Sequence, residues 1–177
     1  YCGYAATLHD TAQAKGWAMP LPLGRIDRQS AQDFARWGRD LGAHLGLMSI
    51  GIHHMRLLPG RRTSLPHAES HEEEFVYVIA GTPDVWLDGH LHPLSPGDAV
   101  GFPAGTGLSH SFLNNSASEV LLLVVGDRPL AENKVLYPTR PDRKPLRKDW
   151  WHDTPDRTLG PHDGVPDARR RERPDTA

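Results

Sequence analysis

The sequence has very little cysteine, no long apolar run and almost no net charge, and each shortage excludes a class of protein. Its one cysteine, Cys2, allows neither a disulfide framework nor a cysteine-based zinc site, and favours a reducing, cytoplasmic compartment. The longest apolar run, Val120–Val125, is far too short to cross a bilayer. A net charge of −2 offers no basic footprint for nucleic acid. We therefore expect neither a membrane nor a nucleic-acid partner.

Glycine, proline and histidine are the residues present in unusual number or distribution. Gly and Pro number 17 and 16 of 177 residues, a composition rich in turns and poor in long helices. Of the 11 histidines, seven lie between His53 and His110. Because imidazole is both a metal ligand and an acid–base group near neutral pH, this clustering favours a metal or acid–base site in that segment.

The segment 48–126 has the texture of an antiparallel β-barrel or sandwich. Short apolar runs there alternate with turn signals roughly every 8–12 residues. The dipeptide Asp88-Gly89 predicts a two-residue hairpin turn, since both positions must adopt positive φ. The expected strands are Ser49–Leu58, Phe75–Ala80, Asp84–Leu87, His90–Leu94, Ala99–Phe102, Ser109–Leu113 and Val120–Val125.

Two extensions flank this segment. Residues 1–47 are expected to carry one helix, which begins at Ser30 with a capping-box pattern, ends near Gly42–Gly46 and has an apolar face of Phe34, Trp37, Leu41 and Leu45. Residues 127–177 are polar and Pro-rich, with too few apolar residues for a core of their own. We expect Tyr137–Pro166 to lie as an arm on the barrel or on a neighbour, followed by a solvated tail. Its expected anchors are Trp150, Trp151 and Leu159.

The run from Glu74 to Ile79 is apolar on both of its alternating faces. Val76 and Val78 share one face, and Phe75, Tyr77 and Ile79 share the other. A half-exposed strand would alternate with polar residues, so this strand is expected to be covered on both sides. The second cover would be another sheet, the N-terminal helix or a partner subunit, and a homodimer is the expected assembly.

Side chains able to bind a metal gather just before this strand. His67, Glu69 and His71 share one face of an extended chain, and Glu72, Glu73 and Glu74 follow them. A metal needs several such groups from more than one element. The best third element is the one that begins at His110, directly after the loop 102–109.

These residues match the two motifs of the cupins. The second motif is carried by Gly97, Pro103, Gly105, His110 and Asn114, with two extra residues in the Gly-to-His loop, and Glu74 and Gly81 set the register of the first. The segment 48–126 therefore resembles a cupin, within that superfamily a small bacterial single-domain member. The resemblance implies an all-β fold, the double-stranded β-helix or jelly-roll barrel, with an N-terminal helix and a C-terminal Pro-rich arm added here.

The resemblance also implies a set of metal ligands. Carried onto this chain, they are His67, Glu69, Glu74 and His110, with Glu69 standing where the family has a second histidine. Such an oxygen-rich set suits Mn²⁺, Fe²⁺ or Zn²⁺ better than copper. His71 could replace Glu69 if the strand end is bulged. In the alternative interpretation the site is degenerate and binds no metal.

Two functions follow, and the sequence leaves both open. One is a metal-dependent isomerase, lyase or dioxygenase that binds a small polar metabolite in the barrel, with His54 or His71 as the acid–base group. The other is a non-catalytic binding or sensing barrel. His53 and His54 are consecutive on the first strand, so only one of them can point inward. His162 is a candidate lid over the pocket mouth.

Overall fold

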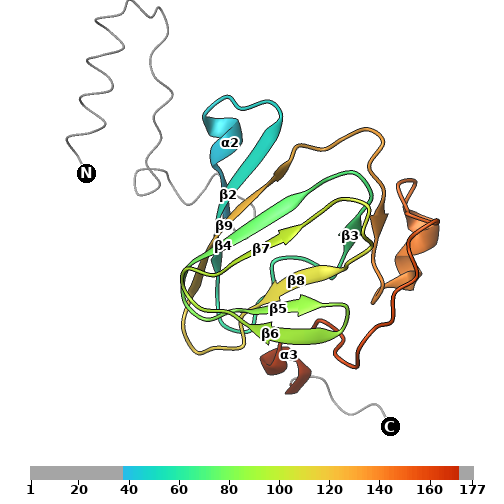
Figure 1. Ribbon diagram of the computed structural model, residues 1–177. Coiled ribbons are helices and arrows are strands. Elements are labelled where there is room, and N and C mark those ends of the chain that lie inside the picture. The colour runs from blue at the N-terminus through green and yellow to red at the C-terminus, as the bar shows by residue number, and fades with distance from the viewer. Residues whose placement is uncertain (1–37, 172–177) are drawn as a thin grey trace, which may run out of the picture.

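The computed structural model of the protein describes residues 38–171. Two antiparallel sheets form the barrel, one of five strands in the order β1-β2-β9-β4-β7 and one of three in the order β6-β5-β8 (Figure 1). The strands of the five-stranded sheet are β1 Gly38–Asp40, β2 Ile50–Leu57, β9 Val120–Asp127, β4 Glu74–Ala80 and β7 Ala99–Phe102. Those of the three-stranded sheet are β6 His90–Pro93, β5 Asp84–Leu87 and β8 His110–Leu113.

The remaining elements are short. A two-stranded pair joins β3 and β10, and the helices lie at the two ends of the described chain. They are β3 Ala68–Glu69, β10 Val135–Leu136, α2 Leu41–His44, the 3-10 helix η3 Pro141–Leu146 and α3 Asp167–Arg171. Between residues 38 and 171 there is no helix with the length and apolar character that a membrane span requires.

The all-β fold and the seven predicted strands are confirmed, with ends that differ by one or two residues. The Asp88-Gly89 turn is also confirmed, with φ of 43° and 90°. This combination matches the right-handed twist of β5 and β6 on either side of the turn. The core lies between the two sheets and is built from alternate residues of each strand. Its buried members include Leu57, Val76, Val78, Val85, Phe112, Val120 and Leu122.

Three expectations need correction. The helix predicted to begin at Ser30 is wrong over 38–40, where the chain forms β1, and only α2 is helical; its part before residue 38 lies outside the described residues. The short strands β3 and β10 were not predicted, because two-residue pairings carry no periodic signal. Among residues 38–171 one face of β4 is buried and the other is partly exposed, with Val76 buried and Tyr77 38% exposed, so of the predicted covers a second sheet from this segment is wrong and a partner subunit stays a prediction.

The Pro-rich arm lies on the barrel, as one of the two alternatives predicted. It is anchored by Trp150 and Trp151, both buried, whereas Leu159 is 42% exposed and is not an anchor. Further along, the arm hydrogen-bonds to the outer face of the three-stranded sheet. The Trp86 indole donates to the His162 carbonyl at 2.7 Å, and Figure 1 shows the arm passing beside that sheet.

Asn114 connects the end of β8 to two other segments. Its side-chain NH₂ donates to the carbonyls of Leu57 and Ser118, both at 2.7 Å, and its side-chain oxygen accepts bonds from the NH and hydroxyl of Ser116. The side chain is fully buried. Because water cannot reach this site, removing the amide would leave several buried polar groups without partners.

We expect Asn114→Ala to lower the free energy of unfolding by about 2–4 kcal/mol, the cost of leaving buried carbonyl and amide groups unpaired. Urea denaturation monitored by circular dichroism measures the change. Ala117→Ser, at an exposed position in the same loop, is the matched control and should change stability by less than about 0.5 kcal/mol. Equal stability of Asn114→Ala and the wild type would contradict the structural role assigned to this amide.

We expect Gly160→Ala to loosen the arm, because the arm backbone meets the Asp88-Gly89 turn at Gly160. An added Cβ would lie 2.5 Å from the His90 Nε2 atom and 2.6 Å from the Gly89 carbonyl oxygen. The arm must then move away, at a cost of about 1–3 kcal/mol, so trypsin should cleave faster after Arg157. Gly101→Ala, where a Cβ meets nothing within 4 Å, is the control and should digest like the wild type.

Candidate active site at the barrel mouth

Three ionisable side chains meet inside the barrel from three separate segments. The backbones of His67 and His110 form an antiparallel bridge with hydrogen bonds of 3.1 and 2.8 Å, so their rings lie 4.9 Å apart between centroids. Glu74, the first residue of β4, brings its Oε1 atom to 3.4 Å from His110 Nε2. Two imidazoles and one carboxylate thus share one cluster, which we call the mouth cluster.

Backbone carbonyls orient both rings of the mouth cluster. The Nδ1 atom of His67 lies 2.9 Å from the Leu65 carbonyl oxygen, and that of His110 lies 3.5 Å from the Leu108 carbonyl oxygen. A carbonyl at Nδ1 favours the proton there and leaves the lone pair on Nε2. The His110 Nε2 atom is buried and has no hydrogen-bond partner within residues 38–171.

The surroundings set the charge of two members of the cluster. Burial, followed by the nearby His110, lowers the pKa of His67 to about 4, so its ring is neutral at neutral pH. Burial acts to raise the pKa of Glu74, but the close contact with His110 at 3.4 Å and its charge, together with the charges of His67 and His53, hold that pKa below its usual range. The cluster therefore contains an ionised carboxylate beside a neutral imidazole.

Glu69 is the fourth residue of the predicted ligand set. Glu69 belongs to β3 and is half-buried. Burial raises the pKa of Glu69 to about 7, and the carboxylates of Glu72 and Glu74 add to the rise, while a hydrogen bond with Asn133 opposes it. The charge of Glu74 thus acts on this carboxyl group. Three residues of the predicted ligand set, His67, Glu74 and His110, meet in the mouth cluster, and the assignment of Glu69 as a ligand stays a prediction.

The two histidines expected to serve as acid–base groups lie elsewhere. His54 is opposite Leu123 in the β2–β9 register, on the outer face of the sheet. His71 is exposed, and its ring shares a hydrogen bond of 2.7 Å with the Ser70 hydroxyl. Neither side chain joins the mouth cluster.

His53 faces the cluster instead, and the sequence analysis left its direction open. It alternates in step with the buried core residue Leu57, so it points into the barrel. Its Nε2 atom lies 3.2 Å from where a Cβ on Gly51 would be, and its charge acts on Glu74. His53 lies four residues before the apolar Leu57 on the same strand, so the two share a face. This spacing in the sequence could have predicted that His53, and not His54, points inward.

Aromatic side chains surround the two cluster histidines. The Phe102 ring stacks on His110 with centroids 3.6 Å apart and planes within 13°. From the C-terminal arm, the Tyr137 ring lies 6.0 Å from the His67 ring, and the guanidinium groups of Arg143 and Arg147 lie 5.6 and 5.1 Å from the centre of the Tyr137 ring. The mouth therefore has apolar walls and a cationic rim.

The arm residue expected as a lid is not at the mouth. His162 lies against the three-stranded sheet, where its carbonyl accepts the Trp86 indole proton and its own backbone NH donates to the Gly89 carbonyl. The arm residue beside the cluster is Tyr137.

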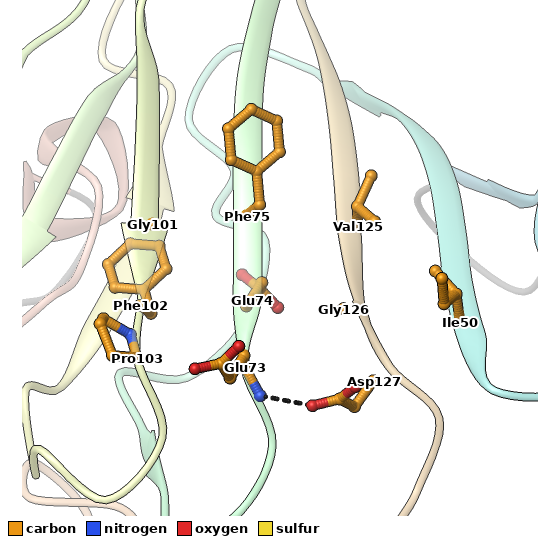
Figure 2. Close-up of a pocket in the computed structure, with 10 residues that line it drawn as sticks. All are labelled: Ile50, Glu73, Glu74, Phe75, Gly101, Phe102, Pro103, Val125, Gly126 and Asp127. Atoms are coloured by element: carbon orange, nitrogen blue, oxygen red, sulfur yellow. Dashed lines mark hydrogen bonds between the residues drawn. The ribbon is translucent and has the colours of Figure 1, made fainter.

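An open groove of about 410 Å³ leads to Glu74 across the ends of β2, β9, β4 and β7 (Figure 2). At its base the Glu73 backbone NH donates to the Asp127 carboxylate at 2.9 Å. The groove thus connects the carboxylate of the mouth cluster with the outer face of the sheet. Its lining consists of Ile50, Glu73, Glu74, Phe75, Gly101, Phe102, Pro103, Val125, Gly126 and Asp127.

The donors of the cluster fit a divalent metal in kind but not in their present spacing. Neutral imidazole Nε2 atoms and carboxylate oxygens are ligands for Zn²⁺, Mn²⁺ and Fe²⁺, and His110 Nε2 is a buried nitrogen without a partner in the described chain. However, residues 38–171 contain no group of three or more His, Cys, Asp or Glu side chains arranged closely enough to hold a metal ion.

Comparison with known proteins decides the family. A family model described as "Cupin domain" matches residues 53–126. A solved structure from Acidithiobacillus ferrooxidans, named as a candidate sugar phosphate isomerase, is 30% identical with a TM-score of 0.63, over 68% of this chain and 83% of that one. The chain belongs to the cupin superfamily.

Two further relatives are similar to this chain. A sugar phosphate isomerase of the cupin superfamily from Silicibacter pomeroyi is 36% identical with a TM-score of 0.55, over 56% of this chain and 63% of that one. Protein SchB of Streptomyces halstedii is 37% identical over 82 residues, which are 46% of this chain and 54% of SchB. This cupin spans about half the length of the curated relatives it matches.

Proposed function

We propose that this cupin is an isomerase that moves a proton between neighbouring carbons of a small, phosphorylated hydroxycarbonyl compound. The observation that carries the proposal is the mouth cluster, where His67, Glu74 and His110 converge from three segments. Proton transfer next to a carbonyl requires a base at the carbon and a group that stabilises the negative oxygen of the enediolate. The imidazole and carboxylate groups of the cluster could act as the base, and a metal held by them would stabilise the oxygen.

We assign a role to each residue of the mouth cluster from its position. His67, Glu74 and His110 would hold a divalent metal, which when bound would polarise the substrate carbonyl. Glu69 and His53 each interact electrostatically with Glu74, and we assign them the transfer of the proton. If Glu69 instead serves as a fourth ligand, His53 remains for that task.

The cationic rim supports a phosphorylated substrate. Arg143 and Arg147 lie over the two-ring stack of Tyr137 and His67, and Arg147 is paired with Asp149. Arg143 is therefore the better candidate to bind a phosphate, as guanidinium groups do with paired hydrogen bonds. The two relatives named for sugar phosphate isomerisation match this cupin at 30% and 36% identity, which favours the same substrate class.

The alternative is a non-catalytic barrel that binds a small molecule without metal. The spacing of the mouth cluster favours it, since no three ligand side chains of the described residues are arranged to hold a metal ion. Glu69, at a position where the family has histidine, favours it as well. The two experiments below separate the alternatives.

Metal content is the first test. Protein purified without a histidine tag should contain close to one equivalent of Zn, Mn or Fe by mass spectrometry, and His110→Ala should lose it because a single ligand is removed from a three-residue set. His71→Ala, an exposed histidine outside the cluster, is the control and should keep the metal. Metal-free wild type would rule out the metal-dependent version. Loss of metal in Glu69→Ala would assign Glu69 as the fourth ligand.

Exchange of substrate protons with solvent is the second test. A panel of aldose and ketose phosphates incubated with the protein in D₂O should lose the signal of the proton next to the carbonyl, followed by proton NMR. We expect Glu69→Gln to slow exchange by about 10²–10⁴-fold, as for loss of a general base. Arg143→Ala should raise KM about tenfold with kcat nearly unchanged, because it removes binding to a non-reacting group.

Binding without exchange for every member of the panel would replace the isomerase with the non-catalytic barrel. His71→Ala again serves as the control and should exchange protons at the wild-type rate, since the side chain is exposed and outside the cluster.

A further inference from the structure

The loop that leads into His110 lies against the C-terminal arm. This loop, residues 103–109, connects β7 to β8, and within it Gly105 and Gly107 have φ of 75° and 69°. Because glycine has the greatest conformational freedom, a loop with two such glycines needs outside contacts to keep one conformation. The arm is close enough to supply them, since a Cβ added on Gly107 would lie 3.2 Å from the Pro155 Cδ atom.

Arg157 is the arm residue that holds this loop at two points. Its Nε atom donates to the Oδ2 atom of Asp88, and its Nη1 atom donates to the Thr106 carbonyl at 3.4 Å. The Oδ1 atom of Asp88 accepts the Ser109 NH at 2.9 Å, and the Asp88 NH donates to the Ser109 carbonyl at 3.0 Å. Arg157 therefore contacts the loop directly at residue 106 and through Asp88 at residue 109.

The carbonyl that orients the His110 ring lies between these two held residues. It belongs to Leu108, and its oxygen is 3.5 Å from His110 Nδ1. This distance is at the long limit of a hydrogen bond, so a small shift of the loop would end the contact. Without that carbonyl the ring proton has less reason to stay on Nδ1, and the lone pair on Nε2 is no longer assured. The position of the loop thus decides which form of the ring faces Glu74.

The Arg157–Asp88 pair is sensitive to the loss of either member. Asp88 is 7% exposed and Ser109 is 1% exposed, whereas 38% of the Arg157 side chain is exposed above them. A buried carboxylate that loses its cation keeps the cost of its desolvation without the compensating attraction. Without Arg157, Asp88 must move towards water, and the Ser109 backbone that is bonded to it must follow.

We propose that Arg157 is a positioning residue for His110, acting through Asp88 and the loop 106–109. A guanidinium group suits this role because it presents several donors in one rigid plane, and so can bond a carboxylate and a carbonyl together. The consequence for catalysis rests on the isomerase proposed above. The orientation of the His110 ring does not, because it depends only on contacts within this chain.

The competing interpretation is that Arg157 only fastens the arm. The arm, however, has attachments of its own close by. The Gly160 NH donates to the Asp88 carbonyl at 2.7 Å, the His162 NH donates to the Gly89 carbonyl at 3.1 Å, and the Trp86 indole donates to the His162 carbonyl. These backbone bonds do not use the guanidinium group. A change at the His110 ring therefore reports on the loop, and not on loss of the whole arm.

The tautomer of His110 is the first test. Long-range proton–nitrogen NMR of the histidine rings, at fixed pH in metal-free protein, should show wild-type His110 with its proton on Nδ1. Arg157→Gln should give a mixture of both tautomers, and His110→Gln assigns the signals. Arg170→Gln is the matched control. It removes another arginine–aspartate pair of the same arm, the 2.6 Å contact with Asp163, and should leave the His110 signals unchanged.

A charge-matched double variant covers the case in which Arg157→Gln does not fold. Arg157→Gln combined with Asp88→Asn leaves no buried charge without a partner, and Asn-Gly suits the same hairpin turn as Asp88-Gly89. This variant should fold and still show both tautomers, because the ion pair that holds the loop is gone. Wild-type ring signals in either folded variant would overturn the proposal, as would a wild type that already populates both tautomers.

Metal affinity is the second test. If the cluster binds Zn²⁺, competition with a chelating dye should show a dissociation constant about tenfold higher in Arg157→Gln than in the wild type and in Arg170→Gln, as for loss of an outer partner of a ligand. Equal affinity would contradict a role at the metal. A wild type that binds no Zn²⁺ would count against the metal-dependent isomerase alone, since the NMR measurement decides the positioning role without metal or substrate.

Discussion

The backbone bridge between His67 and His110 is the interaction on which the site depends. Its two hydrogen bonds, 3.1 and 2.8 Å long, align the segment 62–67 with β8 and hold two imidazoles side by side. A paired backbone inside a barrel is rigid, so the rings need no further adjustment to share one cavity. The Leu65 carbonyl then orients the His67 ring, and Phe102 fills the space beside the His110 ring. Glu74 completes the cluster from the facing sheet.

The ionisable side chains of the site lie at one end of the barrel, and the packed apolar residues and Asn114 lie at the other. Towards the other end the strands contribute Leu57, Val120 and Leu122, all buried. Asn114 anchors that end with side-chain bonds to two carbonyls. The open end holds the mouth cluster, a buried nitrogen without a partner in the described chain, and a groove that reaches the outer face. Buried polar groups without hydrogen-bond partners lower the stability of a fold. Where they are nevertheless present, they often mark a functional site.

The two faces of the five-stranded sheet carry different side chains. The inner face carries Glu74 and His53 towards the cluster, while the outer face one residue along carries Phe75 and His54. Alternation along a strand makes the same segments build both surfaces.

The sequence by itself determined the fold family, the strand order along the chain and the meeting of His67, Glu74 and His110 at the mouth. These follow from local patterns: turn residues at fixed intervals, alternation, and motif spacing. It did not decide which of His53 and His54 faces inward, that His162 lies away from the mouth, or that the outer side of β4 is partly exposed among residues 38–171. Those depend on register and on contacts between segments far apart in the sequence, which only the assembled barrel specifies.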